Sequence, residues 1–150
     1  MLSREKFLQV VRNTPLVSID LLVHDAAGRW LVGERINQPA RGTWFVPGGV
    51  VYKDEALADA FARVTQAELG EARPIAAADF LGVYEHFYDT NFAEAPGFGT
   101  HYVVLAYRLS EPWEGGRLPE AQHAGYRWLD AEALVADPGV HENTRRYFRP

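Results

Sequence analysis

Hydrophobic and polar positions alternate along this chain in a pattern that predicts short strands, turns and a few helices. Runs of β-branched and large apolar residues, bounded by Gly, Pro, Asn or Asp, indicate the strands. The predicted strands span residues 16–24, 30–35, 44–46, 80–87, 101–109 and 126–129, and the first two are expected to form a hairpin. Helices are predicted over residues 4–12, 131–135 and 141–148, with another before Gly70. This mixture predicts an α/β fold in a single domain, residues 1–150.

The longest helical pattern lies between Gly48 and Gly70. Asp54 is its expected N-cap, because an aspartate side chain can accept hydrogen bonds from the first turn of a helix. Steps of four, three and four place one set of residues on a single helix face: Leu57, Phe61, Val64 and Glu68. The apolar members should face the core and carry the Glu68 carboxylate with them. A buried carboxylate is costly unless it is paired or binds a metal, so Glu68 is the first candidate for function.

Composition and charge exclude several classes of function. The net charge of −5 disfavours a broad basic face for nucleic acid. Without cysteine, the chain has neither disulfides nor thiolate metal sites. It contains no run of about 20 apolar residues for a membrane span, and its charged N-terminus lacks the apolar core of a signal peptide. We therefore expect a cytoplasmic protein with neither a nucleic-acid nor a membrane partner.

The stretch from Gly49 to Gly70 resembles the Nudix box, in which a Gly, five residues, a Glu and seven residues precede Arg-Glu-hydrophobic-x-Glu-Glu-x-Gly. Five residues match at these spacings: Gly49, Glu55, Arg63, Glu68 and Gly70. Val64 and Ala67 replace two glutamates of the box that normally hold extra metal ions, so we expect one ion. These losses, together with residues 13–18 and 141–143, are similar to the GDP-mannose mannosyl hydrolase branch of the superfamily. The resemblance implies the Nudix fold, a mixed β-sheet sandwiched between helices (α/β/α).

Glu68 is the predicted metal ligand. The ion is expected to be Mg²⁺, with Mn²⁺ as a possible substitute, because Mg²⁺ is often held by one or two protein oxygens plus substrate phosphates. The resemblance implies that the Gly48 carbonyl and the Gln122 side chain complete the protein ligands. The alternative for Glu68 is a structural ion pair with Arg63 or another arginine, and for Gln122 an ordinary loop amide. We expect mainly structural roles for Glu55 and Arg63, with Arg63 pairing to Asp59 one helical turn away.

His123 is the predicted general base, because an imidazole with an ordinary pKa near 6.5 can take a proton from water at neutral pH. The resemblance at residues 122–123 carries this assignment. From the residues alone, a solvated loop histidine is the simpler interpretation. His86 and His101 are less favoured candidates for the base.

Arg35, Tyr102 and Asp20 match family positions that act on the substrate. The resemblance implies that Arg35 and Tyr102 stabilise the departing diphosphate and that Asp20 holds the sugar or the base. The alternatives are a strand-end solubility residue for Arg35, core packing for Tyr102 and a turn hydrogen bond for Asp20.

Guanine recognition is expected from Phe7 and from the aromatic-rich segment 84–92, which contains His86, although core packing is the competing interpretation. Val50 replaces a family arginine that reaches the diphosphate. Lys53 substitutes for it only as a point charge, since a lysine cannot make a bidentate contact.

Together these residues predict Mg²⁺-dependent hydrolysis of a nucleotide sugar. The expected substrate is GDP-mannose or GDP-glucose, cleaved to GDP and free hexose by water attack at the anomeric carbon with inversion. One alternative is conventional Nudix attack at phosphorus, and another is a non-catalytic nucleotide-sugar binding module. The family also implies a homodimer.

Overall fold

The structure is a computed structural model, and it describes residues 2–121 and 123–150. The chain starts with α1 (Arg4–Asn13), which Ser3 caps by accepting a hydrogen bond from the Lys6 backbone N–H. The remaining elements, in chain order, are β1 (Leu16–Leu22), β2 (Trp30–Arg35), β3 (Trp44–Phe45), β4 (Gly48–Val50), α2 (Leu57–Leu69), η1 (Ile75–Ala77), β5 (Ala78–Tyr88), β6 (Thr100–Leu109), β7 (His123–Leu129), α3 (Ala131–Ala136) and α4 (Glu142–Arg145).

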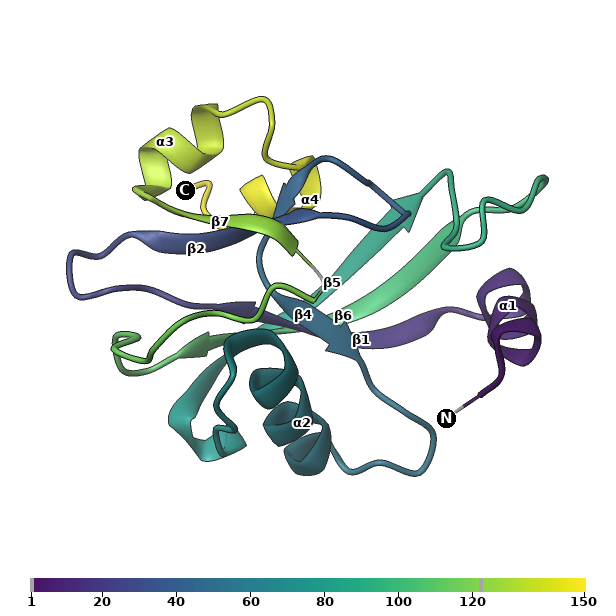
Figure 1. The fold of residues 1–150 in the computed structure, drawn as a ribbon, viewed down its shortest axis with the longest axis horizontal. Coiled ribbons are helices and arrows are strands. Elements are labelled where there is room, and N and C mark those ends of the chain that lie inside the picture. Colours follow the sequence, from purple (N-terminus) through teal and green to yellow (C-terminus); the bar gives the residue numbers. More distant parts are fainter. Residues whose placement is uncertain (1, 122) are drawn as a thin grey trace.

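The strands form two sheets between helical layers (Figure 1). One sheet is mixed, with the order β4-β1-β6-β5, in which β1 and β6 are parallel and the other neighbours are antiparallel. The other sheet is antiparallel, with the order β3-β2-β7. Figure 1 shows α2 on one side of the sheets and α3 with α4 on the other side. The predicted α/β/α arrangement is thus confirmed.

Two hydrophobic clusters hold these layers together. Ile19 and Leu21 of β1 pack against Phe61 and Val64 of α2, and all four side chains are almost fully buried. A smaller cluster joins Val32 of β2 to the helices on the other side. None of the helices in residues 2–121 and 123–150 is long and apolar enough to span a membrane.

The predicted hairpin of residues 16–24 and 30–35 is wrong beyond its turn. The two segments are joined near the turn, where His24 forms an isolated bridge with Trp30, and then diverge into different sheets. Each strand finds longer pairing elsewhere, since β1 pairs with β4 and β6 while β2 pairs with β3 and β7.

Several predicted boundaries also need correction. Asp54 does not cap α2, because its backbone is left-handed (φ 64°) and the cap position is Ala56. Leu57 is 41% exposed instead of facing the core, since it is the first residue of the helix. The last helix, predicted over 141–148, is only Glu142–Arg145. β7 starts at His123, so this histidine lies on a strand and not in a loop.

Candidate active site

The centre of the site is formed by β1, β4 and α2. Asp20 of β1 lies opposite Gly48 of β4 in the strand register, and the Gly48 N–H donates a 3.0 Å hydrogen bond to Glu68 Oε1 of α2. A side chain at position 48 would clash, because a Cβ there would lie 2.5 Å from the Ile19 carbonyl oxygen and 2.6 Å from Asp20 Oδ1. The glycine therefore allows a strand backbone to lie directly between two carboxylates.

Most of the predicted site residues line one cavity of about 140 Å³. It brings together Asp20, Arg35, Gly48, Glu68, Tyr102 and His123. Tyr88, from the predicted recognition segment 84–92, also lines it, as do Ser18 of the family-like segment 13–18 and the box residues Gly49 and Val50. Residues that the sequence did not single out complete the wall: Asn37, Phe45 and Val46. Residues from both sheets and from α2 meet here, so the cavity exists only in the folded chain.

His123 is buried beside Glu68. Its side chain is 6% exposed, and its Nε2 atom lies 3.6 Å from Glu68 Oε1. The ring packs against Gly33 of β2, where an added Cβ would come within 2.4 Å of His123 Nδ1. Among the described residues, neither ring nitrogen has a hydrogen-bond partner. The interpretation of His123 as a solvated loop histidine is therefore wrong.

Asp20 is held from the side of the sheet away from α2. The Tyr147 hydroxyl donates a 2.5 Å hydrogen bond to Asp20 Oδ2, and the same hydroxyl lies 3.3 Å from His86 Nε2. Burial raises the pKa of the Asp20 carboxyl to about 7, with the charge of Glu68 acting in the same direction. The Tyr147 hydrogen bond and the charge of Arg35 oppose that rise. The predicted turn hydrogen bond for Asp20 is replaced by this long-range contact.

Arg35 and Tyr102 face the cavity from opposite sheets. Arg35 lies at the end of β2, where its guanidinium carbon is 5.5 Å from the centre of the Phe45 ring. Its Nε is buried and has no hydrogen-bond partner among the described residues. Burial raises the pKa of the Tyr102 hydroxyl, while the nearby charge of Arg35 lowers it. A cation and a neutral hydroxyl donor thus line the same cavity from two sheets, which suits an anionic ligand.

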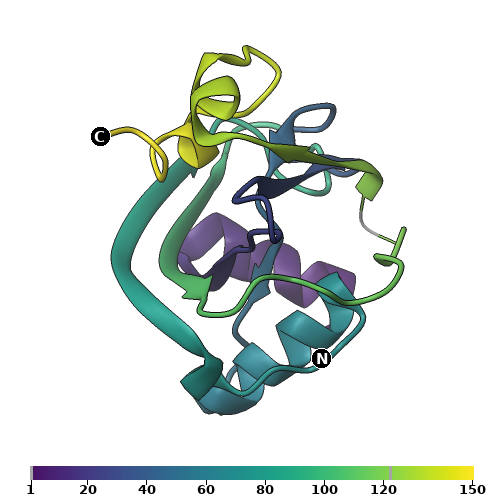
Figure 2. The same cartoon turned by 90° about the vertical axis from the view of Figure 1, so that its left-hand side faces the viewer.

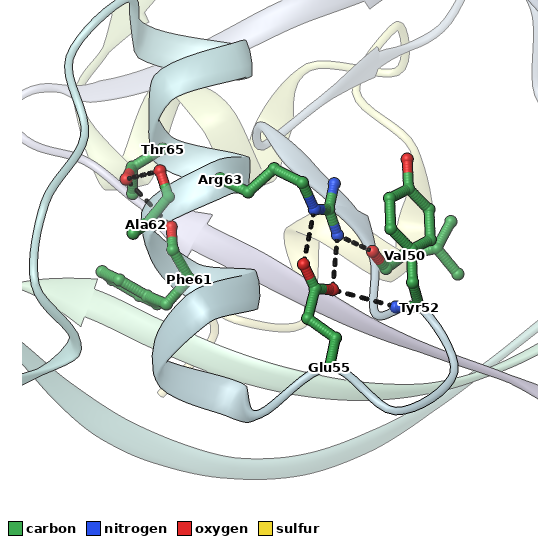
Figure 3. A network of polar contacts seen from close by, with 7 residues as sticks. All are labelled: Val50, Tyr52, Glu55, Phe61, Ala62, Arg63 and Thr65. Atoms are coloured by element: carbon green, nitrogen blue, oxygen red, sulfur yellow. Dashed lines mark hydrogen bonds and ion pairs between the residues drawn. The ribbon is translucent and has the colours of Figure 1, made fainter. Parts of the chain in front are cut away.

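Glu55 and Arg63 have the structural role that was expected, but with a different pairing (Figure 3). Arg63 donates to both carboxylate oxygens of Glu55, at 2.8 and 2.9 Å, and to the Val50 carbonyl oxygen at 2.6 Å. Glu55 also accepts from the Tyr52 N–H at 3.0 Å. The predicted Asp59–Arg63 pair is wrong, because Arg63 turns toward the loop before α2 instead of along the helix. These bonds tie that loop to α2.

The residues present fit a divalent cation that takes few ligands from the protein and the rest from waters and substrate phosphates. Glu68 is 4% exposed and lines the cavity, and its only ion-pair partner in the described part of the chain is His123. Its predicted alternative pairing with Arg63 is wrong, since Arg63 binds Glu55. Within residues 2–121 and 123–150, no group of three His, Cys, Asp or Glu side chains could form an all-protein metal site. Mg²⁺ suits such a site, because it commonly keeps waters and takes substrate phosphates as ligands. The third predicted ligand, Gln122, lies outside the described residues.

Three predicted substrate contacts do not line the cavity. The Phe7 ring packs 5.1 Å from Phe92, between α1 and the loop after β5. Lys53 has a 91% exposed side chain and pairs with Asp54. His86 is buried behind the cavity wall, where its Nε2 lies 3.3 Å from the Tyr147 hydroxyl and its ring meets the cavity residue Tyr88 edge-on at 6.4 Å. Tyr147 itself was missed, and the only sequence signal near it is the family-like segment 141–143.

Comparison with known proteins agrees with this fold. A model of the NUDIX domain matches residues 14–149. The low-salt glycan biosynthesis protein Agl8 of Haloferax volcanii is 46% identical over 142 residues, which cover 93% of this chain and 83% of Agl8.

Solved structures share the fold at lower identity. The MutT protein of Methanosarcina mazei superposes with a TM-score of 0.71 at 20% identity, covering 91% of this chain and 92% of that one. The NUDIX domain of Shewanella oneidensis NrtR, complexed with ADP ribose, gives 0.65 at 18% identity and covers 98% and 95%. The chain belongs to the Nudix family.

Proposed function

We propose that the protein hydrolyses a nucleotide sugar, with GDP-mannose or GDP-glucose as the substrate, to a nucleoside diphosphate and a free hexose. The observation that carries the proposal is the buried pair of His123 and Glu68, 3.6 Å apart at one cavity with Asp20 and Arg35. Such a pair provides a base, His123, beside a carboxylate that can both stabilise the protonated imidazole and bind a metal ion. The name of the similar Agl8, a glycan biosynthesis protein, supports a sugar-bearing substrate.

In the proposed reaction, His123 takes a proton from water as the water oxygen bonds to the anomeric carbon. The bond from that carbon to the diphosphate oxygen breaks, and its electron pair leaves on the β-phosphate. A positioned base of this kind contributes a factor of about 10² to 10⁴. The Glu68 carboxylate stabilises the charged imidazole, and attack from the side opposite the leaving group inverts the carbon.

Arg35 and Tyr102 bind the departing diphosphate in this proposal, because both can donate hydrogen bonds to phosphate oxygens. Asp20 accepts hydrogen bonds from sugar hydroxyls and so orients the ring. Glu68, the Gly48 carbonyl and Gln122 are the proposed ligands of a single Mg²⁺, with Mn²⁺ as a substitute. When bound, this ion supplies positive charge against the diphosphate.

Conventional Nudix attack at phosphorus is the second candidate. Val64 and Ala67 disfavour it, because the box glutamates that would hold extra ions or act as base are missing. A binding module without turnover is the third candidate, and the buried placement of His123 beside Glu68 disfavours it. Val50, where the family has an arginine, favours lower activity or a shifted preference among nucleotide sugars.

A product assay in ¹⁸O-labelled water tests the proposal directly. The protein is incubated with GDP-mannose and Mg²⁺, and we expect label in free mannose with unlabelled GDP. Label in GMP or mannose 1-phosphate would establish attack at phosphorus instead. Absence of turnover with a panel of nucleotide sugars that nevertheless bind would establish the binding module. Without Mg²⁺, the labelled mannose should disappear.

The homodimer and the cytoplasmic location also remain proposals. Phe80, Val83 and Phe87 on β5 are 54%, 60% and 63% exposed, on the edge strand of the mixed sheet (Figure 2). This 11-residue strand is about 36 Å long and can pair antiparallel with its own copy across a two-fold axis. Sedimentation should give a dimer in the wild type and a monomer in Val83→Asp. A wild-type monomer at high concentration would overturn this proposal.

A further inference from the structure

The C-terminal segment contacts the lining of the candidate active site at several points. The His141 ring stacks on Phe45 with ring centres 4.7 Å apart, and Thr144 Oγ1 accepts a 3.3 Å hydrogen bond from the Val46 N–H. A third contact is made by the Tyr147 hydroxyl. Tyr147 follows α4 in the chain, yet its side chain bonds to Asp20 on β1, 127 residues away in sequence. Figure 2 shows this end of the chain beside β5, which carries His86. The contact therefore joins the last segment of the fold to the central strand of the cavity.

The hydrogen-bond directions in this contact follow from the number of available protons. In its ionised form the Asp20 carboxylate can only accept, so the single proton of the Tyr147 hydroxyl then goes to Asp20 Oδ2. The hydroxyl oxygen can then accept from His86 Nε2, 3.3 Å away. Burial lowers the pKa of His86 to about 4, so near neutral pH this histidine carries one N–H. The resulting order is His86 to Tyr147 to Asp20.

The Tyr147 ring is held in place by aromatic neighbours. Tyr84 meets it edge-on with ring centres 4.7 Å apart, and the His86 ring lies at 6.0 Å. Phe148 also packs against it edge-on at 6.5 Å. Because the ring is fixed, its hydroxyl gives Asp20 Oδ2 a defined position and thereby sets the plane of the carboxylate.

The other Asp20 oxygen is the one available for a ligand. Oδ1 lies beside Gly48, where only the missing side chain of glycine leaves room for it. Asp20 lines the cavity, whereas Tyr147 and His86 do not. The hydrogen bond that Tyr147 makes directly to the cavity lining is therefore the one to Asp20.

We infer that Tyr147 is a positioning residue, which fixes the Asp20 carboxylate so that Oδ1 accepts hydrogen bonds from the sugar of the substrate. This inference rests on the proposed function for the identity of the sugar, but not for the contact between Tyr147 and Asp20. It assigns the C-terminal segment a role in recognising the sugar. The rival interpretation is that Tyr147 only anchors this segment to the sheet.

The test compares Tyr147→Phe with Tyr107→Phe. Tyr107 is buried, whereas Tyr147 is partly buried, and it packs against Phe61 and Phe80, on the α2 side of the same sheet. With GDP-mannose, Tyr147→Phe should lower kcat/KM by about 10- to 100-fold, the effect of one lost hydrogen bond to a charged group. Affinity for GDP, which lacks the sugar, should stay within about twofold of the wild-type value. Loss of anchoring alone does not produce this combination of a lower kcat/KM for GDP-mannose and an unchanged affinity for GDP.

A double-mutant cycle with Asp20→Asn sharpens the comparison. If Tyr147 acts through Asp20, adding Tyr147→Phe to Asp20→Asn should cause little further loss of kcat/KM, because the two residues act as a unit. If the loss of kcat/KM in the double variant equals the product of the losses in the two single variants, the inference is overturned. A Tyr147→Phe variant whose kcat/KM and GDP affinity both match those of Tyr107→Phe would overturn it as well.

A spectroscopic measurement separates failure of the inference from failure of the proposed function. The ¹³C carboxyl resonance of Asp20, assigned by its loss in Asp20→Asn, should shift in Tyr147→Phe and stay in place in Tyr107→Phe. If the wild type turns over no nucleotide sugar, this resonance alone decides whether Tyr147 fixes the carboxylate. An unchanged resonance overturns the inference. If Tyr147→Phe does not fold, 3-fluorotyrosine at position 147 keeps the ring and changes the acidity of its hydroxyl, and the same shift is expected.

Discussion

Glu55 and Glu68 are both box carboxylates beside a basic side chain, but their surroundings differ. Glu55 accepts two hydrogen bonds from Arg63 and one from the Tyr52 N–H, and its side chain is 16% exposed. The Glu68 side chain is 6% exposed and accepts one hydrogen bond in the described part of the structure, from the Gly48 N–H. Most of the roughly four acceptor sites of the Glu55 carboxylate are thus used by Arg63 of α2 and by the Tyr52 N–H. Glu68 retains capacity at a cavity wall, which is where a ligand can use it.

The basic partners differ in the same way. Arg63 binds Glu55 and the Val50 carbonyl, so its guanidinium is occupied by the protein. His123 lies 3.6 Å from Glu68, beyond hydrogen-bonding distance, and has no other partner among the described residues. The comparison teaches that a match to the box pattern does not give the role of a residue. The number of protein hydrogen bonds already made at each position separates the two roles.

The largest effect is expected from His123→Gln. Removing the proposed base should lower kcat by a factor of about 10² to 10⁴. The affinity for Mg²⁺ should change little, because the imidazole is not a proposed ligand. Steady-state kinetics and a Mg²⁺ titration check the two parts. Near-normal turnover in this variant would remove His123 from the base role.

Glu68→Gln should act on the metal. Losing the only proposed carboxylate ligand should weaken Mg²⁺ binding by at least about 10- to 100-fold. Losing a residue that only hydrogen-bonds to a metal ligand already has an effect of this size. The measurement is the Mg²⁺ concentration that gives half-maximal turnover, supported by calorimetric titration. An unchanged Mg²⁺ requirement would contradict the assignment of Glu68.

Glu55→Gln should act on stability instead of activity. The loss of charge weakens a partly exposed ion pair, so we expect a fall of about 1 kcal/mol in the free energy of unfolding. kcat/KM should stay within a few-fold of the wild type, since the cavity lining does not include Glu55. Asp59→Asn is the matched control, because it removes a nearby exposed carboxylate, in the first turn of α2, that does not bind Arg63. Equal destabilisation by both variants would contradict the special role of Glu55.

The smallest effect is the pH dependence of the stability that the Glu55–Arg63 pair contributes. The hydrogen bonds from Arg63 and Tyr52 hold the pKa of Glu55 at about 2, below its usual 4.5. Between these values the unfolded chain binds the proton and the folded chain does not, so stability falls as pH falls. The contribution is complete above pH 4.5. The stability difference between wild type and Glu55→Gln, measured by urea unfolding, should therefore shrink from pH 6 toward pH 2. A constant difference would contradict the assigned pKa.

Several features of the site were predictable because they are local in sequence. The spacing of α2 placed Glu68 on the same buried face as Phe61 and Val64, and the structure confirms this face. Gly70 ends the helix in the left-handed conformation, as a glycine at this position predicts. The box resemblance and helical periodicity thus located the carboxylate before its surroundings were known.

Other features depend on contacts between distant segments. The partner of Arg63 lies eight residues away across a turn, and that of Asp20 lies 127 residues away. Likewise, β1 and β2 leave their hairpin for different sheets. Periodicity carries no signal for such choices, because several strands and polar groups compete for each partner.

The sequence by itself determined the order of most elements, although not β4 and η1, together with the glycines that permit close approach and the placement of one acid on a buried helix face. These follow from the conformational freedom of single residues and from the period of a helix or strand. Only the tertiary structure decided that His123 lies beside Glu68 and that Tyr147 holds Asp20. Packing of the two sheets fixes those distances, and the fold brings the pairs together because burying apolar side chains far from the site determines where each backbone lies.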